Sequence, residues 1–214
     1  MSVDVLVVED DDLTRITLSS SLKAAGADNV YSASTASEAL TLAHKHLPTA
    51  ALLDLHLGAG PTGLDVARQL RAQNSRIGIV ILTSYEDPRL LGENPDFIPA
   101  GTKYLLKRDI SDISVVTQAL SSAPSSSKLL SRPNMKLLGS KLSENQLMIL
   151  KLVAEGYSNS EIARRRGVSD KAVEGTLTRL ANKLGLEKDS TSNQRVHIAR
   201  VYFRALGLNL GDVE

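Results

Sequence analysis

The chain has 214 residues, a formal net charge of +1 and no cysteine, which excludes a disulfide framework and a thiolate metal site. The amino terminus lacks a basic region followed by an apolar stretch, and the longest purely apolar runs have about the length of a strand. The sequence therefore predicts neither a signal peptide nor a transmembrane helix. We expect a soluble, cytoplasmic protein without a membrane partner.

A stretch of small polar residues at 121–127 predicts a linker between two domains. The charge divides at this point: residues 1–124 carry 15 acidic and 10 basic side chains, a balance of −5, whereas residues 125–214 carry 9 and 15, a balance of +6. The basic second half indicates a polyanionic partner such as nucleic acid. The predicted boundaries are 1–121 for the first domain, 122–138 for the linker and 139–208 for the second domain.

The first domain alternates apolar runs with stretches of helical periodicity. The runs that predict buried strands are 3–8, 50–53, 77–82 and 104–106. The stretches that predict helices are 13–25, 37–46, 64–73 and 110–120. Strands that alternate with helices favour an α/β fold with a doubly wound parallel sheet, covered on both faces.

Each of these apolar runs brings a polar side chain to its carboxyl end. Glu9 and Asp10 follow the first run and Asp54 follows the second, while Thr83 comes directly after the third and Lys107 after the fourth. Open parallel sheets place their sites at the carboxyl ends of the strands. Carboxylates, a hydroxyl and an ammonium gathered there can hold a divalent metal and a phosphoryl group.

The residue types indicate phosphoryl chemistry with magnesium. Mg²⁺ prefers oxygen ligands and keeps several waters, so one or two carboxylates and a phosphate oxygen suffice. Asp10 and Asp54 are candidate ligands, with Glu9 acting directly or through water. One carboxylate must also be the nucleophile that forms an acyl phosphate, and Asp54 is the better choice because it sits centrally. Lys107 would neutralise the phosphoryl oxygens, and Thr83 would donate a hydrogen bond to one of them.

In this order and at about these separations, the first 121 residues resemble the receiver domain of two-component response regulators. The segments that carry the resemblance are 7–10, 53–55, 82–84 and 104–107. The resemblance implies a flavodoxin-like fold and the following roles: Asp54 as phosphoacceptor; Glu9, Asp10, Asp54 and the backbone carbonyl of His56 as Mg²⁺ ligands; Thr83, Tyr104 and Lys107 as signalling residues. Tyr104 would be the aromatic side chain that changes rotamer.

Two features depart from the receiver pattern. The loop at residues 56–63 is one residue longer and richer in glycine than the usual receiver loop, which could change how fast water or a phosphodonor reaches the site. Receivers normally carry a helix between the positions of Thr83 and Tyr104, but this chain has Pro88, Pro95 and Pro99 there. Proline inside a helix costs roughly 3 kcal/mol, so we expect about one turn at 89–93 and no full-length helix. Altered coupling or dimer geometry would follow.

Helix caps organise the second domain. Two segments, 143–146 and 158–161, fit capping boxes, and the helices they open are predicted to end at Gly156 and near Gly167. Ser169 is placed as the amino cap of a third helix at about 170–184, after a three-residue turn. Helix, short turn and helix form the DNA-binding helix-turn-helix pattern, in which the later helix enters the major groove.

Segments 142–143, 155–163, 168–169 and 183–186 resemble LuxR-type domains. A receiver followed by such a domain resembles the response regulators of the NarL/FixJ family. The resemblance implies a fourth helix at about 193–206 that helps the domain to dimerise on double-stranded DNA. It also implies a sensor histidine kinase as the phosphodonor and a homodimer as the active form.

The third helix should expose Lys171, Glu174, Gly175, Thr178, Arg179, Asn182 and Lys183. The candidate phosphate contacts are Lys171, Arg179 and Lys183, together with Arg164, Arg165 and Arg166. Family members usually reach base edges from the positions of Glu174, Gly175 and Thr178. Glu174 could accept a hydrogen bond from a cytosine amino group or could repel phosphate, and both alternatives stay open. Gly175 costs roughly 0.8–1 kcal/mol of helix stability, which indicates close backbone approach or mere drift.

The sequence favours a DNA-binding response regulator in which phosphorylation of Asp54 by a histidine kinase controls dimerisation and transcription. It would not be an enzyme, except that it could catalyse its own phosphotransfer and dephosphorylation. One alternative is a phosphorylation-independent transcription factor whose receiver serves as a protein-interaction domain. Another is a phosphorelay or phosphate-sink protein.

Overall fold

A computed structural model gives the fold and describes residues 3–122, 142–186 and 193–208. The chain divides into two compact units, one of residues 1–84 and 91–135 and one of residues 85–90 and 136–214. Apart from Ser122, the predicted linker at 122–138 lies outside the described residues. Within the described ranges, no helix combines the length and the apolar character that crossing a membrane requires.

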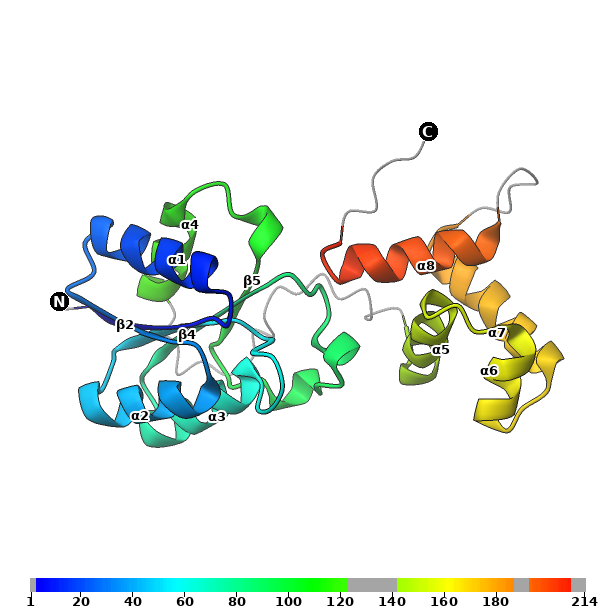
Figure 1. The fold of residues 1–214 in the computed structure, drawn as a ribbon, viewed down its shortest axis with the longest axis horizontal. Coiled ribbons are helices and arrows are strands. Elements are labelled where there is room, and N and C mark those ends of the chain that lie inside the picture. The colour runs from blue at the N-terminus through cyan, green and yellow to red at the C-terminus, as the bar shows by residue number, and fades with distance from the viewer. Residues whose placement is uncertain (1–2, 123–141, 187–192, 209–214) are drawn as a thin grey trace. The chain divides into compact units, whose positions relative to one another are not determined.

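A five-stranded parallel sheet forms the centre of the first unit. Its strands are β1 (Asp4–Val8), β2 (Asn29–Ala33), β3 (Ala50–Leu53), β4 (Gly78–Thr83) and β5 (Lys103–Leu106), in the order β2-β1-β3-β4-β5. The helices are α1 (Asp12–Ala24), α2 (Ala36–His46), α3 (Gly63–Gln73) and α4 (Ile113–Ser122). Figure 1 shows α1 and α4 on one face of the sheet and α2 and α3 on the other. The doubly wound α/β prediction is confirmed.

The edge strand β2 is the strand that the apolar runs did not reveal. Of its five residues only Ala33 is buried, and Asn29 and Ser32 are exposed. An edge strand pairs with a single neighbour, here β1, so its two faces need not both be apolar. By contrast, every residue of β3 and of β4 is buried, which explains why these central strands read as continuous apolar runs.

The connection from β4 to β5 contains no α-helix, although the structure describes all of it. It contains two short 3₁₀-helices, η1 (Pro88–Leu91) and η2 (Pro95–Phe97). The Asn94 side chain caps η2 by accepting a hydrogen bond from the Asp96 backbone N–H at 2.9 Å. The prediction that the prolines exclude a full-length helix is therefore confirmed, although two short turns form, at 88–91 and 95–97, instead of the one expected at 89–93.

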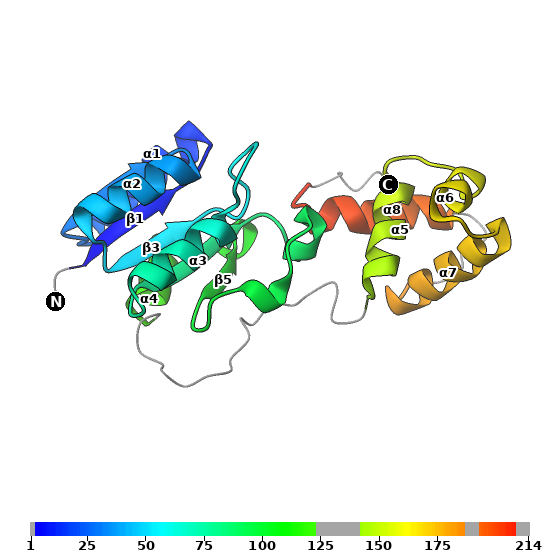
Figure 2. The same cartoon turned by 90° about the horizontal axis from the view of Figure 1, so that it is seen from below.

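The second unit is helical in its described part, with α5 (Glu144–Ala154), α6 (Asn159–Arg166), α7 (Asp170–Lys183) and α8 (Gln194–Ala205). Leu150, Ile162, Leu180 and Ile198, one from each helix, are fully buried in a shared core. Figure 2 shows α6 and α7 side by side, joined by the short turn that Gly167 begins in the left-handed conformation (φ 64°). This is the predicted helix-turn-helix.

The two predicted capping boxes have different outcomes. At α5 both halves form, because Ser143 accepts from the Gln146 N–H and Gln146 accepts from the Ser143 N–H. At α6 Ser158 accepts from the Glu161 N–H at 3.2 Å, but the Glu161 carboxylate bonds to Arg164 and Arg165 instead of returning to the cap. Charged partners one turn along the helix outcompete a neutral backbone N–H for this carboxylate.

Candidate functional site

The polar residues predicted to meet do lie together at the carboxyl edge of the first unit's sheet. Glu9 follows β1, Asp54 follows β3, Thr83 ends β4 and Lys107 follows β5. The register pairs Val8 with Leu53, the residues before Glu9 and Asp54, and pairs Thr83 with Leu106, the residue before Lys107. The strands therefore end at matching levels. We call Glu9, Asp10, Asp54, Thr83 and Lys107 the edge cluster.

Lys107 joins the two buried carboxylates of the edge cluster. Its Nζ lies 2.8 Å from Glu9 Oε2, 3.0 Å from Glu9 Oε1 and 2.8 Å from Asp54 Oδ2. Glu9 is 2% exposed and Asp54 is 8% exposed, so both ion pairs are shielded from water. The ammonium thus stands beside the oxygen at which an acyl phosphate would form.

Burial and close contact shift the pKa values of two groups in the edge cluster. Burial, opposed by Lys107 and assisted by Asp54, raises the pKa of Glu9 from its ordinary value of 4.5 to about 7. Burial alone would lower the pKa of Lys107, but the charges and hydrogen bonds of Asp54 and Glu9 outweigh it and hold that pKa above its usual value. Burial is therefore the main reason that Glu9 keeps its proton to a higher pH than an ordinary carboxyl.

The carboxylates fit a divalent cation. Among the described residues, Glu9, Asp10 and Asp54 each offer an oxygen, and these oxygens lie within 4.8 Å of one another. Hard oxygen donors with room for water are the ligands that Mg²⁺ prefers. Asp10 is exposed, so the site is open on one side. The His56 backbone N–H lies 3.4 Å from Asp54 Oδ1, and its side chain is exposed; the role of its carbonyl as a ligand stays a prediction.

Two of the three predicted signalling residues, Thr83 and Tyr104, lie on neighbouring strands. Thr83 is fully buried at the end of β4. Tyr104 is half-buried on the edge strand β5, where it pairs with Ile81 of β4. Since Tyr104 pairs with Ile81, two residues before Thr83 on β4, the two side chains point to the same face of the sheet, and their roles in signalling stay predictions.

Three residues beside the edge cluster were not predicted from the sequence: Thr62, Gly63 and Glu93. A Cβ on Gly63 would lie 1.9 Å from the backbone carbonyl oxygen of Asp54, so the start of α3 packs directly against the phosphoacceptor candidate. The Thr62 hydroxyl donates to Glu93 Oε1 at 2.8 Å, which joins the loop after β3 to the β4–β5 connection. The Thr62–Asp65 capping box was a readable signal for the helix start, but no local pattern points to Glu93.

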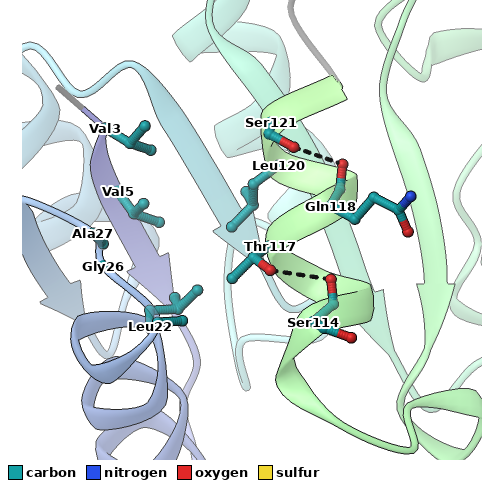
Figure 3. A pocket seen from close by; sticks show the side chains of 11 residues that line it. Val3, Val5, Leu22, Gly26, Ala27, Ser114, Thr117, Gln118, Leu120 and Ser121 are labelled. Atoms are coloured by element: carbon teal, nitrogen blue, oxygen red, sulfur yellow. Dashed lines mark hydrogen bonds between the residues drawn. The ribbon is translucent and has the colours of Figure 1, made fainter. Parts of the chain in front are cut away.

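A separate pocket of about 480 Å³ lies at the opposite end of the sheet, between β1, the carboxyl end of α1 and α4. Figure 3 shows Val3, Val5 and Leu22 on one side of it and Thr117 and Leu120 of α4 on the other. Since Val3 and Val5 lie at the amino end of β1, this apolar pocket is distinct from the edge cluster.

In the second unit, α7 presents the predicted residues to solvent with one exception. The exposed residues are Lys171, Glu174, Thr178, Arg179, Asn182 and Lys183, whereas Gly175 is half-buried. The opposite face of α7 packs into the core through Val173, Leu177 and Leu180. Asp170 accepts from the Ser160 hydroxyl at 2.7 Å and so ties the start of α7 to α6.

The three consecutive arginines of α6 are exposed but already have partners. Arg164 and Arg165 each lie 2.7 Å from Glu161 Oε1, and these bonds lower the pKa of Glu161 to about 2. Arg165 also stacks over the Tyr157 ring at 3.9 Å from its centroid, and Arg166 bonds to Asn145. A DNA phosphate would have to compete with these partners. In α7 it would have to compete in the same way with Thr176 for Arg179 and with Gln146 for Lys183, since both contacts measure 3.0 Å.

None of the described residues of the domain requires glycine at position 175. A Cβ there would meet only Arg179 Nη1 at 3.6 Å, an ordinary contact with the end of a flexible side chain. The two alternatives for this glycine, close approach to DNA or drift, therefore both stay open. The choice between base contact and phosphate repulsion for Glu174 stays open in the same way.

Two family models match the chain: the response regulator receiver domain over residues 5–117, and the bacterial regulatory proteins of the luxR family over residues 140–200. The response regulator protein VraR of Staphylococcus aureus is 30% identical over 197 residues, which cover 87% of this chain and 92% of VraR.

Solved structures of the response regulator RcsB share the fold. RcsB in a DNA complex matches with a TM-score of 0.61 at 18% identity, over 96% of this chain and 100% of that one. RcsB of Salmonella typhimurium matches with a TM-score of 0.53 at 19% identity, over 97% and 99%. At these identities the likeness to RcsB is one of fold.

Proposed function

Because this chain belongs to the two-component response regulators that join a receiver domain to a LuxR-type DNA-binding domain, we propose that phosphorylation of Asp54 controls its dimerisation and its action on transcription. The observation that carries the proposal is the Lys107 ammonium, which lies 2.8 Å from both Asp54 and Glu9 at the carboxyl edge of the sheet. A sensor histidine kinase is the expected donor.

In the proposed reaction, an Asp54 carboxylate oxygen attacks the phosphorus of the donor, a new P–O bond forms, and the bond from phosphorus to the donor's leaving group breaks. Lys107 is placed to neutralise the phosphoryl oxygens, because its Nζ already contacts Asp54 Oδ2. Thr83 would donate its hydroxyl proton in a hydrogen bond to a phosphoryl oxygen. Hydrolysis of the acyl phosphate returns the carboxylate, so the chain would catalyse only its own phosphorylation and dephosphorylation.

Glu9, Asp10 and Asp54 would hold Mg²⁺, with the backbone carbonyl of His56 as a further ligand. When bound, the cation would supply positive charge that offsets the charge of the phosphoryl group. The fit rests on the three carboxylate oxygens, which lie within 4.8 Å of one another.

The DNA-binding unit would act through α7 in the major groove. Lys171, Arg179 and Lys183 are proposed as phosphate contacts, and Glu174 and Thr178 face outward where base edges could be reached. The proposed order is phosphorylation, dimerisation and then tighter DNA binding, since a ligand or modification shifts a two-state equilibrium only through differential contacts.

The test is to incubate the full chain with Mg²⁺ and acetyl phosphate and to follow its intact mass beside Asp54→Asn. We expect a gain of one phosphoryl group in the wild type alone, with a rise in the dimer fraction by sedimentation and in affinity for duplex DNA. Failure to gain a phosphoryl group from acetyl phosphate and from histidine-kinase donors would refute the proposal.

One structural observation favours a second candidate, a transcription factor that is indifferent to phosphate. The connection that receivers fill with a helix holds only the turns η1 and η2 here, so the usual route of signal transmission is altered. This candidate predicts that Asp54→Asn and wild type bind DNA equally well after exposure to acetyl phosphate. The same pair of proteins therefore discriminates between the two functions.

A further inference from the structure

The two places where this chain departs from the receiver pattern meet at one side-chain contact. The longer loop after Asp54 ends at Thr62, and the helix-free β4–β5 connection contains Glu93 between η1 and η2. Thr62 Oγ1 donates to Glu93 Oε1 at 2.8 Å, across 31 residues of sequence. Although it lies in a surface connection, the Glu93 side chain is only 15% exposed.

The Thr62 end of this contact is held firmly against the phosphoacceptor. Thr62 is the amino cap of α3, where its backbone N–H donates to Asp65 Oδ2 at 2.8 Å. The next residue, Gly63, donates its N–H to the Leu55 carbonyl at 3.0 Å and has no room for a Cβ beside the Asp54 carbonyl. A displacement of Thr62 would therefore be transmitted to the backbone at Asp54.

The Glu93 end is held by a cation from α3. Arg68 lies 2.5 Å from Asp65 Oδ1 and 3.9 Å from Glu93 Oε2, so it offsets the charge of both carboxylates. The same guanidinium lies over the Phe97 ring of η2, 5.7 Å from its centroid. The beginning of α3 thus secures two points of the β4–β5 connection.

We propose that Glu93 is a positioning residue that keeps the glycine-rich loop 56–62 closed over Asp54 and so slows hydrolysis of the acyl phosphate. The proposal rests on the proposed function, since it concerns the lifetime of phosphorylated Asp54. The loop contains Gly58 and Gly60, both at positive φ, and a Cβ on Gly58 would lie 3.7 Å from Asp10 Oδ2, so the loop passes beside the edge cluster. Through Glu93, the β4–β5 connection would hold the loop in place although it contains no α-helix.

The test compares Glu93→Ala and Glu93→Gln with wild type in the full chain. After phosphorylation with acetyl phosphate and removal of the donor, the half-life of the acyl phosphate is followed by intact mass. We expect Glu93→Ala to shorten it about threefold to tenfold, equivalent to about 0.7–1.4 kcal/mol of activation free energy. Glu93→Gln should stay near wild type, because its amide oxygen still accepts from Thr62. Equal half-lives in all three proteins, or equal losses in Ala and Gln, would overturn the proposal.

Two controls separate positioning from general damage. Glu38 also accepts a hydrogen bond near a helix start, from Ser34 in the loop before α2. This loop follows β2, which β1 separates from β3 and Asp54, so Glu38→Ala should leave the half-life unchanged. In a Thr62→Val background, Glu93→Ala should have no further effect, because the acceptor has lost its donor. Additive effects of the two substitutions would contradict the proposed contact.

A second measurement does not depend on phosphorylation. Hydrogen exchange of peptides that cover 56–62 should be at least about threefold faster in Glu93→Ala than in Glu93→Gln for the unphosphorylated chain. Equal exchange in the two variants would refute the positioning role even if the wild type accepts phosphate. If the wild type accepts none while exchange differs as expected, the proposed function fails and the contact's effect on the loop stands.

Discussion

Replacing Glu9 by glutamine should stabilise the receiver at neutral pH, although it removes an ion pair. Glu9 is 2% exposed, and its pKa in the folded protein is about 7 compared with an ordinary value of 4.5. Between these values the folded state binds a proton that the unfolded state lacks, so stability falls as the pH rises through this window. The contribution of the protonated Glu9 carboxyl to the stability of the fold is fully present below about pH 4.5 and is lost above about pH 7.

The expected difference in the free energy of unfolding follows from the shift in the pKa of Glu9. Each pKa unit corresponds to about 1.4 kcal/mol, so the full difference would be about 3 kcal/mol. Lys107 is 27% exposed in its side chain and can adjust toward the carboxylate, which reduces the expected value to about 1–3 kcal/mol. The glutamine in Glu9→Gln cannot ionise. The free energy of unfolding of this variant should therefore exceed that of wild type by this amount at pH 8 and equal it near pH 5.

The assay is urea unfolding of the full chain in EDTA, followed by hydrogen exchange of peptides from β1 and β3, which report on the receiver alone. Glu38→Gln, on the surface of α2, is the matched control and should follow wild type at both pH values. A Glu9→Gln protein that is less stable than wild type by the same amount at pH 5 and pH 8 would refute the reasoning. In that case the ion pair with Lys107 would outweigh the cost of burial.

Five further substitutions test the packing and the DNA surface. Gly63→Ala places a Cβ 1.9 Å from a backbone oxygen and should cost about 1–3 kcal/mol in urea unfolding. Gly175→Ala, whose Cβ would meet only the end of the flexible Arg179 side chain, should gain roughly 0.5–1 kcal/mol; equal effects would contradict the geometry. Ser143→Ala removes the amino cap of α5 and should lower the stability of the DNA-binding unit by about 1 kcal/mol, measured by thermal melting. Lys171→Gln should weaken DNA binding and reduce by about 1 the slope of the logarithm of the binding constant against the logarithm of the salt concentration. Lys23→Gln on the receiver should change neither quantity. An unchanged slope in Lys171→Gln would show that Lys171 does not contact phosphate.

Local chemistry made much of the fold readable. The central strands β3 and β4 are buried on every residue, so they could be recognised as apolar runs without knowledge of their partners. Helix starts could be placed from side chains that bond within three residues of themselves, as Ser143 and Ser169 do. Proline ruled out a helix after β4 for an equally local reason, the lost N–H and the steric clash of its ring.

Features that depend on partners far away in sequence could not be read. The strand β2 lacks an apolar run because it lies at an edge, and edge position is a property of the whole sheet. A competition within one helical turn could not be read either. The Glu161 carboxylate fitted a capping box, but it bonds to Arg164 and Arg165, whose charged donors outcompete the neutral backbone N–H of the cap.

The sequence by itself determined which residue types stand at the carboxyl ends of the strands and which side of α7 is apolar, because both follow from the periodicity of single elements. Only the tertiary structure decided that Lys107 touches Glu9 and Asp54, 98 and 53 residues away, and that Thr62 bonds to Glu93. Strand order and register set these distances, and the burial that they produce raises the pKa of Glu9. The polar groups are encoded locally, whereas their energies depend on the neighbours and the solvent exclusion that only the assembled sheet provides.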